Sequence, residues 1–410
     1  MVTSNIRTNM RRRVLLFSGG AAIMHPMISL AEDEDPWGRA SGYPTGWGTP
    51  RGLSRDKRMR VGNFSGGFEA MLPSRTIQCG QEDPLQDRPR SDLRYHFNGV
   101  SKTPDDYMAT SPVTGLLIAR RGEVWWEKYQ FGRTPEMRMM GWSMSKSVTS
   151  LLLGIAIDQK LIASLEDKAS LYVPWLAGTL HGEVSLRNLM NMSSGAEIVH
   201  DQANNTIYPA ALTGPRADIK PTVRDWNVRR EVEGSRFNYN ELCPLTIGMV
   251  LRAATRMSLS EYAEQFLWRP MGAEANATWL TDRHRNEFNC IGFAATLRDW
   301  SRLGRLVAQG GQMNGKQIVS REWMESYGRW ESNEAQVRYG ALGTPFPAAY
   351  KAFIWHTKSD GTRPLFSGAE GQRVLIDVPT QTVLAQTGID GTGDWQREIY
   401  ALFQAAVTAR

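Results

Sequence analysis

The sequence Gly141-Trp142-Ser143-Met144-Ser145-Lys146-Ser147-Val148, followed by the apolar run from Leu151 to Ile157, decides how this chain is interpreted. From Val148 onward the apolar residues recur at helical spacing, which predicts a buried helix. Ser143 and Lys146 are three positions apart, so they share one face of its first turn.

This spacing has a chemical use. A serine hydroxyl is a weak nucleophile until a base takes its proton, and a lysine serves as that base only if burial and nearby positive charge lower its pKa toward neutrality. A helix N-terminus supplies part of that field and a backbone N–H for a developing oxyanion. Ser-x-x-Lys also occurs by chance in many proteins, so the assignment depends on the rest of the chain.

The surrounding pattern predicts strands at both ends of the chain and helices between them. Capping residues Ser258 and Thr296 each open a helix, and a loop from His200 to Pro209 is long enough to shape a substrate pocket. The expected strands are 113–119, 124–131, 352–356, 365–367, 373–378 and 382–387, and the other expected helices are 185–192, 240–256 and one capped by Asp394. This order predicts a sheet assembled from N- and C-terminal segments plus a mainly helical domain.

Two later motifs extend the pattern: Gly234-Ser235-Arg236-Phe237-Asn238-Tyr239-Asn240, and Phe366-Ser367-Gly368-Ala369-Glu370-Gly371-Gln372 before a strand. With the Ser-x-x-Lys helix, the chain resembles the serine β-lactamase and penicillin-recognising superfamily. It is most similar to the class C-like, family VIII-type esterases and the 6-aminohexanoate-dimer hydrolases. The resemblance runs from about residue 95 to the C-terminus and includes 186–195 and 296–304. It implies an α/β (α+β) fold of the β-lactamase/transpeptidase type, with an antiparallel sheet flanked by helices and a mainly helical domain.

The expected organisation has three parts. Residues 1–31 form a signal peptide, 32–94 an extended N-terminal arm rich in Gly, Pro, Trp and Arg, and 95–410 the catalytic domain. Within that domain we expect the sheet to come from about 110–135 and 345–410, and the helical insertion to span about 160–340.

The resemblance also assigns roles to residues. It makes Ser143 the nucleophile, Lys146 its proton acceptor and Tyr239 the residue that relays a proton to the leaving group. The backbone N–H groups of Ser143 and Ala369 form the oxyanion hole. The residues expected to contact substrate are Trp142, Asn240, Glu241, Phe366 and Gly368.

Two departures from the family pattern bear on the substrate. Glu241 stands where the family usually has Asn, and Phe366 stands in place of the Lys of Lys-Thr-Gly, although Gly371-Gln372 is an alternative register for this motif. A site without that cation loses a charge-assisted bond to a substrate carboxylate, unless Arg363 swings into the vacated place. The expected activity is therefore cleavage of a small ester or linear amide through an acyl-enzyme. A D-alanyl peptidase or β-lactamase, or a catalytically inactive penicillin-binding-like protein, is the alternative.

The charge distribution bears on partners and location. The chain has 48 Lys and Arg residues against 42 Asp and Glu residues. Four of these arginines (Arg7, Arg11, Arg12 and Arg13) precede the apolar stretch from Val14 to Ala31, so the remainder is close to neutral at 44 against 42. The arginines followed by the apolar stretch predict an exported protein, periplasmic or secreted, whose signal resembles the twin-arginine type. A membrane anchor is the alternative for this segment. We expect a small-molecule substrate, no nucleic-acid partner and no stable membrane insertion after signal cleavage, and the sequence does not indicate an oligomeric state.

Metal and disulfide chemistry have little support. Cys79, Cys243 and Cys290 are far apart, and the six histidines form no ligand cluster. We expect three buried free cysteines, no metal and no cofactor.

Overall fold

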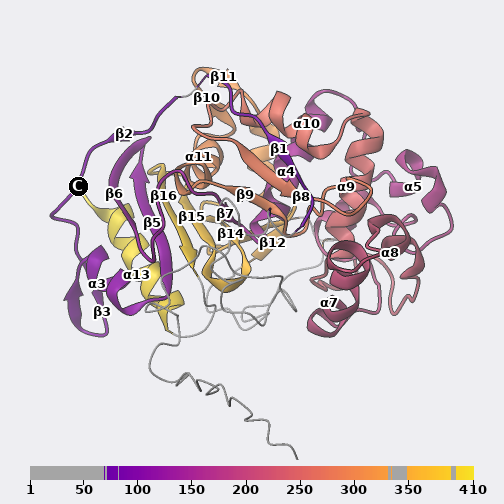
Figure 1. Cartoon of the computed structure of the whole chain (residues 1–410), viewed down its shortest axis with the longest axis horizontal. Helices are drawn as coiled ribbons and strands as arrows, with labels where there is room; N and C mark the ends of the chain where they lie inside the picture. Colours follow the sequence, from indigo (N-terminus) through magenta and orange to yellow (C-terminus); the bar gives the residue numbers. More distant parts are fainter. Residues whose placement is uncertain (1–68, 70–71, 82, 331–333, 335–348, 389–393) are drawn as a thin grey trace, which may run out of the picture. The chain divides into compact units, whose positions relative to one another are not determined.

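The computed structural model describes residues 69, 72–81, 83–330, 334, 349–388 and 394–410 (Figure 1). The signal peptide predicted at 1–31 and the first part of the predicted arm lie outside the described residues. Among the helices of the described part, none is both long and apolar enough to cross a bilayer.

The main sheet joins segments from both ends of the sequence, as predicted. Its strand order is β12-β13-β14-β15-β16-β5-β6-β2, and neighbouring strands are antiparallel except for β2 and β6. In chain order the strands are β2 (Gln86–Asp87), β5 (Val113–Arg120), β6 (Glu123–Tyr129), β12 (Ala349–Lys351), β13 (Ile354–His356), β14 (Pro364–Ser367), β15 (Arg373–Asp377) and β16 (Thr382–Gly388).

A second, four-stranded sheet was not predicted. Its order is β1-β8-β9-β7, all antiparallel, and it places residues just before the predicted nucleophile beside a strand that comes more than a hundred residues later. These strands are too short for alternation to reveal them. They are β1 (Ser74–Ile77), β7 (Met139–Met140), β8 (Ala277–Leu280) and β9 (Phe293–Ala295); the hairpins β3 (Tyr95–Phe97) with β4 (Val100–Lys102) and β10 (Gln312–Met313) with β11 (Lys316–Gln317) complete the strands.

The helices fall into two groups. α11 packs on β5, β15 and β16, and α13 contacts β3, β16 and α3, whereas α5, α7, α8 and α9 gather beyond the β12 end of the sheet (Figure 1). The α-helices are α3 (Pro104–Thr110), α4 (Met144–Asp158), α5 (Ala169–Tyr172), α6 (Leu186–Met190), α7 (His200–Tyr208), α8 (Ile219–Asp225), α9 (Leu242–Thr255), α10 (Leu259–Ala263), α11 (Leu297–Ala308), α12 (Arg321–Ser326) and α13 (Trp395–Thr408). Short 3₁₀ or π segments are η2 (Pro174–Leu176), η3 (Pro209–Thr213), η4 (Glu264–Trp268) and η6 (Ala369–Gly371).

Helix α4 is buried on every side. All its residues from Met144 to Ala156 are buried, not only the apolar stripe from which the helix was predicted. Two of its hydroxyl groups bond to distant segments of the chain: Ser147 Oγ donates to Phe353 O at 3.1 Å, and Ser150 Oγ lies 3.2 Å from Tyr327 Oη. A helix surrounded by protein holds its first turn in a fixed place.

Several predicted helix starts are confirmed in detail. Ser258 and Glu261 form a capping box at α10, and Ser185 and Thr296 each accept a backbone N–H from three residues ahead. Asp394 occupies the N-cap position of α13, but its side chain makes no capping hydrogen bond.

Two local predictions are wrong. The loop expected from His200 to Pro209 is helix α7 followed by η3. Of the strand expected at 352–356, only 354–356 form a strand, β13, which pairs with the unpredicted β12. Ala352 and Phe353 take left-handed φ angles of 50° and 63° and turn the chain between these strands. Non-glycine residues rarely adopt this conformation, so their composition gave no turn signal.

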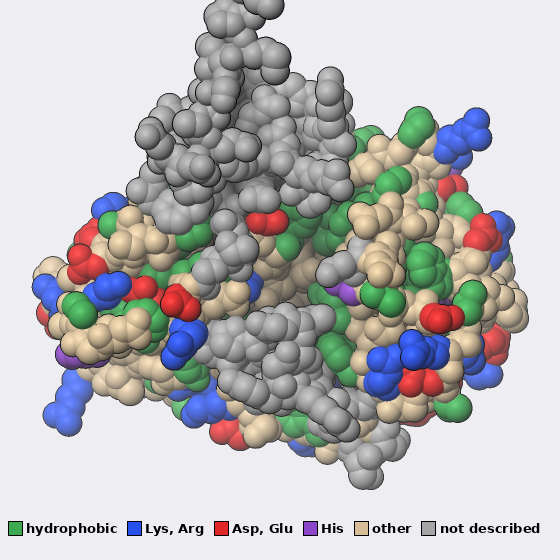
Figure 2. Space-filling view, turned by 90° about the horizontal axis from the view of Figure 1, so that it is seen from below, with side chains coloured by type: hydrophobic (Ala, Val, Ile, Leu, Met, Phe, Trp, Pro, Cys, Tyr) green, Lys and Arg blue, Asp and Glu red, His purple; other side chains and the backbone are tan. Residues whose placement is uncertain are grey.

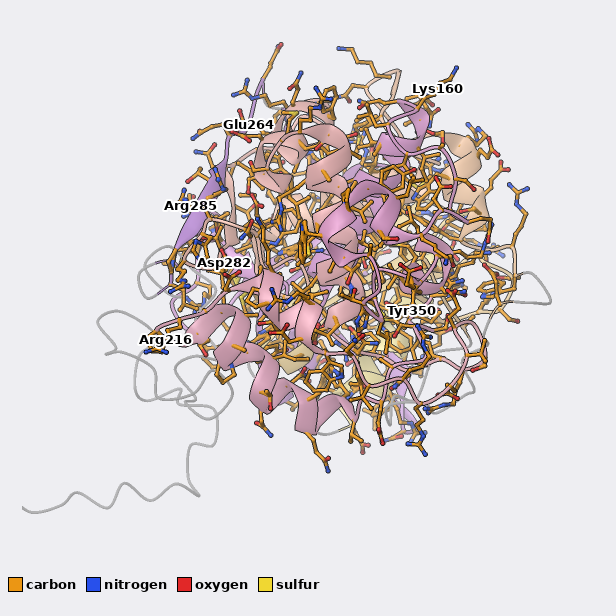
Figure 3. The ribbon with its side chains drawn as sticks, turned by 90° about the vertical axis from the view of Figure 1, so that its right-hand side faces the viewer. Lys160, Arg216, Glu264, Asp282, Arg285 and Tyr350 are labelled. Atoms are coloured by element: carbon orange, nitrogen blue, oxygen red, sulfur yellow. The ribbon has the colours of Figure 1, made fainter. Side chains whose placement is uncertain are left out.

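The surface of the described part has both signs of charge interspersed over the face that Figure 2 shows. Exposed Arg216, Arg285 and Lys160 project from the periphery, whereas Tyr350 is only 2% exposed (Figure 3). This distribution agrees with the nearly neutral balance of the sequence after residue 31.

The packing of α4 against Trp323 can be tested at Gly154. A Cβ at this position would lie 2.4 Å from Cδ1 of Trp323, so Gly154→Ala should lower the free energy of unfolding by about 1–3 kcal/mol through overpacking. In a Trp323→Ala background the same change should raise the free energy of unfolding by up to about 1 kcal/mol, because alanine stabilises a helix more than glycine does. Urea denaturation of the four proteins measures both effects; the same sign in both backgrounds would contradict this packing.

Candidate active site

Ser143 lies at the junction between the second sheet and α4. Strand β7 leads into Gly141 and Trp142, whose φ of 49° is left-handed, and Ser143 occupies the N-cap position of α4. The Gly141 N–H donates to Phe293 O at 2.9 Å, and the Met144 N–H donates to Gly141 O at 3.0 Å. A Cβ on Gly141 would lie 2.3 Å from the Trp300 ring, so only glycine fits at this turn.

Lys146 and Ser143 meet as their spacing predicted. Lys146 Nζ lies 3.0 Å from Ser143 Oγ, 3.0 Å from the Cys290 carbonyl oxygen and 2.6 Å from Glu241 Oε2. The side chains of Lys146 and Glu241 are each only 1% exposed. One buried amino group is therefore surrounded by a hydroxyl, a carbonyl and a carboxylate.

This environment changes the expected charge of Lys146. Burial by itself lowers the pKa of the lysine, but the Glu241 carboxylate opposes burial, and the result is a pKa raised above its ordinary value. This direction is opposite to the lowering of the Lys146 pKa that was expected from the sequence, because the amino group is paired with the Glu241 carboxylate. Burial and the helix N-terminus can be inferred from the sequence, whereas the carboxylate partner comes from a distant segment.

Tyr239 is part of an aromatic cluster beside Lys146. Its ring stacks on Trp355 at a centroid distance of 5.7 Å and meets His200 and Tyr350 edge-on at 5.1 and 6.0 Å. Lys146 Nζ lies 4.9 Å from the Tyr239 ring centroid, within the range of a cation–π contact. Burial raises the pKa of Tyr239, and the charge of Lys146 counteracts part of that rise, so the phenol is protonated at neutral pH. The proton-relay role of Tyr239 stays a prediction.

The two residues after Tyr239 have different surroundings. Asn240 is 1% exposed, and its side-chain oxygen accepts the Cys243 N–H at 2.9 Å in the first turn of α9, whose N-cap residue is Glu241. Glu241 Oε1 accepts from Tyr208 Oη at 3.4 Å, while Oε2 faces Lys146. Both side chains are thus engaged within the protein, and their contact with substrate stays a prediction.

The third motif reaches the nucleophile through its glycine. A Cβ on Gly368 would lie 2.1 Å from the Gly141 carbonyl oxygen, so the end of β14 passes directly beside the turn that precedes Ser143. Ala369, the predicted second oxyanion donor, is the next residue along and begins η6. In the alternative register, Gln372 is fully buried and its amide donates to Gly388 O at 2.8 Å. The geometry favours the register with Gly368 next to the site.

The cation expected to be lost is not replaced by Arg363. Phe366 is fully buried, and the Arg363 guanidinium is bonded to the Asp377 carboxylate and lies 5.3 Å from the Phe403 ring centroid on α13. Arg363 is thus committed to contacts with Asp377 and α13.

Sequence reasoning missed three contributors to the site. The Cys290 carbonyl, the Tyr208 hydroxyl and the Trp355 ring contact Lys146, Glu241 and Tyr239 respectively. Backbone carbonyls and packing aromatics carry no local signal, and Tyr208 appeared only as part of a supposed loop.

The structure also bears on the predicted metal and cysteine chemistry. Within the described ranges no group of three His, Cys, Asp or Glu side chains is placed to hold a metal ion. All three cysteines are free; Cys243 and Cys290 are buried as expected, but Cys79 is only partly buried.

Comparison with known proteins agrees with this architecture. The Beta-lactamase family model matches residues 94–347. The chain is 26% identical over 283 residues to 6-aminohexanoate-dimer hydrolase from Paenarthrobacter ureafaciens, covering 66% of this chain and 71% of that protein.

Solved structures show the same fold. One is a Bacillus anthracis protein provisionally named 6-aminohexanoate-dimer hydrolase, with a TM-score of 0.75, 20% identity, and coverage of 87% of this chain and 95% of that one. Another is a family VIII carboxylesterase, with a TM-score of 0.58, 16% identity, and coverage of 74% and 95%. The predicted α/β fold of the β-lactamase/transpeptidase type is confirmed, and this chain belongs to the beta-lactamase family of serine hydrolases.

Proposed function

We propose that this protein cleaves a small ester or a linear amide through an acyl-enzyme on Ser143. The observation that carries the proposal is the 3.0 Å contact between Ser143 Oγ and Lys146 Nζ at the start of a helix that is buried from Met144 to Ala156. Attack by Ser143 forms the acyl–oxygen bond and expels an alcohol or amine, and water then releases the acid. Tyr239 is suited to carry a proton toward the leaving group, and the N–H groups of Ser143 and Ala369 to hold the oxyanion.

The charge balance of the site favours a neutral or cationic substrate over an anionic one. Phe366 supplies no positive charge, and Arg363 is committed to Asp377. Glu241, which stands where the family usually has Asn, brings a carboxylate to the site, but its contact with Lys146 makes the pair neutral overall. The expected substrate preference therefore rests on the missing cation. A charge-assisted hydrogen bond from such a cation to a substrate carboxylate contributes about 1.5–3 kcal/mol.

The names of the similar proteins support the same choice. The curated relative is named as a dimer hydrolase for 6-aminohexanoate, and one structural neighbour is named as a carboxylesterase. The D-alanyl peptidase or β-lactamase alternative needs recognition of a substrate carboxylate, for which Phe366 is unsuited. The alternative of an inactive binding protein does not explain why Ser143 and Lys146 are in contact.

We further propose that the protein is exported to the periplasm or secreted through the basic and apolar segment at 1–31, and acts there on a small molecule without a nucleic-acid partner or stable membrane insertion.

A phosphonate probe should label Ser143 covalently, because a serine activated for acyl transfer also attacks phosphorus. Peptide mapping by mass spectrometry identifies the labelled residue. Ser143→Ala should lose labelling and hydrolysis together. Ser150→Ala, in the same buried helix but bonded to Tyr327, should keep both. Full activity in Ser143→Ala would disprove the assignment.

A substrate panel tests the charge argument. We expect measurable cleavage of a short-chain aryl ester or a linear 6-aminohexanoate amide, and a kcat/KM for a chromogenic cephalosporin lower by at least about a hundredfold. This ratio corresponds to roughly 2.7 kcal/mol of transition-state stabilisation. Cephalosporin turnover equal to the ester rate would favour the β-lactamase alternative.

Export can be followed by cell fractionation. The full chain, expressed in a bacterium with both general secretory and twin-arginine pathways, should appear shortened in the periplasmic fraction. Replacing Arg12 and Arg13 by lysine should retain it in the cytoplasm if the signal is of the twin-arginine type. Recovery of full-length protein in the membrane fraction would instead support an anchor.

A further inference from the structure

The ion pair at the site raises a problem for proton transfer. A lysine ammonium has three N–H donors and no acceptor, and Lys146 Nζ lies among oxygen atoms: those of the Ser143 hydroxyl, the Cys290 carbonyl and the Glu241 carboxylate. In this state the nitrogen has no lone pair with which to take the serine proton. Lys146 becomes a base only after it gives one proton away.

The carboxylate of Glu241 is the nearest acceptor. Its Oε2 atom lies 2.6 Å from Nζ, closer than either the serine hydroxyl or the Cys290 carbonyl. An amide carbonyl is far less basic than a carboxylate. Water has poor access, because both charged side chains are 1% exposed.

We propose that Glu241 is a positioning residue that stores the lysine proton during acylation. This inference rests on the proposed function of Ser143 as a nucleophile. The pair changes from ammonium and carboxylate to amine and carboxylic acid, and the amine then takes the proton of Ser143 as Oγ bonds to the acyl carbon. The site begins neutral and ends with one oxyanion, one ammonium and one neutral acid, so charge and protons balance. When the leaving group departs with the ammonium proton, the stored proton returns from Glu241 to Lys146.

The surroundings favour this exchange over loss of the proton to water. Burial in a medium of low dielectric constant penalises two separated charges, and a neutral amine and acid avoid that penalty. A substrate that covers Ser143 excludes more water and shifts the pair further in that direction.

The neighbouring titratable groups do not compete for the proton. Burial raises the pKa values of the tyrosines and thiols around the pair, that of Cys243 to about 11, so these groups stay neutral between pH 5 and 9. They are Tyr208 on α7, Tyr239 before α9, Cys243 on α9, Cys290 before β9 and Tyr350 on β12. His200 on α7 lies against the Tyr239 ring and is the remaining titratable group that faces the cluster among the described residues.

The residue type at 241 distinguishes this chain from the pattern it resembles. An asparagine there would bond to Lys146 but could not accept its proton. The carboxylate therefore gives Lys146 a proton store inside the protein, and the pH dependence of Ser143 reactivity should show it.

The test compares the rate of phosphonate labelling of Ser143 from pH 4 to 10 in the wild type and in Glu241→Gln. In the wild type the proton acceptor is inside the protein, so the rate should stay level from neutral to alkaline pH and fall only at acidic pH. In the variant Lys146 must release its proton to water, so the rate should fall below the lysine pKa. The pH at which labelling is half-maximal should therefore be higher in Glu241→Gln than in the wild type by at least about one pH unit. At alkaline pH the variant should be labelled as Lys146 loses its proton. Both proteins retain His200, so its contribution is the same in the two profiles.

Two further variants separate this role from a structural one. Glu287→Gln breaks another buried ion pair, in which Arg252 Nη1 lies 3.3 Å from Glu287 Oε2, and it should change stability but not the midpoint. Lys146→Arg keeps the positive charge but cannot release a proton, so it should not be labelled at any pH. A Glu241→Gln profile that is lowered equally at every pH, with an unchanged midpoint, would overturn the proposal.

If Glu241→Gln does not fold, the pH profile of the wild type alone tests whether Glu241 stores the proton. A labelling rate that declines between pH 10 and 7, as a lysine gains its proton, would overturn the role of Glu241. Absence of wild-type labelling at every pH would instead contradict the proposed function, which is a different outcome.

Discussion

One buried ammonium needs one buried carboxylate, and much of the site follows from that need. Removing one partner of a buried ion pair typically costs about 3–5 kcal/mol, because the other charge is left without compensation. Lys146 on α4 and Glu241 at the start of α9 therefore hold two helices together at the position of the nucleophile. The Cys290 carbonyl brings in the segment before β9, and the second sheet fixes the turn that presents Ser143.

The same constraint links electrostatics to substrate choice. A pocket that carries an isolated lysine would attract anions, whereas a lysine matched by a carboxylate presents almost no net charge. The absence of a cation at Phe366 acts in the same direction. The aromatic cluster around Tyr239 packs beside the pair and adds no charge to the site.

The sequence contained enough information to predict the main architecture and the central contact. Ser143 and Lys146 are close in sequence and lie on one helix, so a spacing rule places them together correctly. The strands of the main sheet and the capped starts of α6, α10 and α11 also carry local signals. The pairing of Lys146 with Glu241 joins two distant segments, and no spacing rule reports how their side chains turn. The same limit explains the missed β8 and β9, which are defined by their partners and not by their own alternation. Helix α7 was mistaken for a loop because its polar residues are poor helix formers, and its conformation depends on tertiary contacts.

The main sheet has a consequence for the order in which the molecule assembles. One of its inner ladders pairs β5 with β16, so Ala119 lies opposite Val383, which comes 264 residues later in the sequence. The hairpin of β5 and β6 is complete early in synthesis, yet one edge of β5 has no partner until β16 emerges. Pairing of this kind is slow because a very long loop must close first, and an exposed strand edge is a template for aggregation. The helical region between these strands is therefore made before the sheet can close, and it has time to fold first.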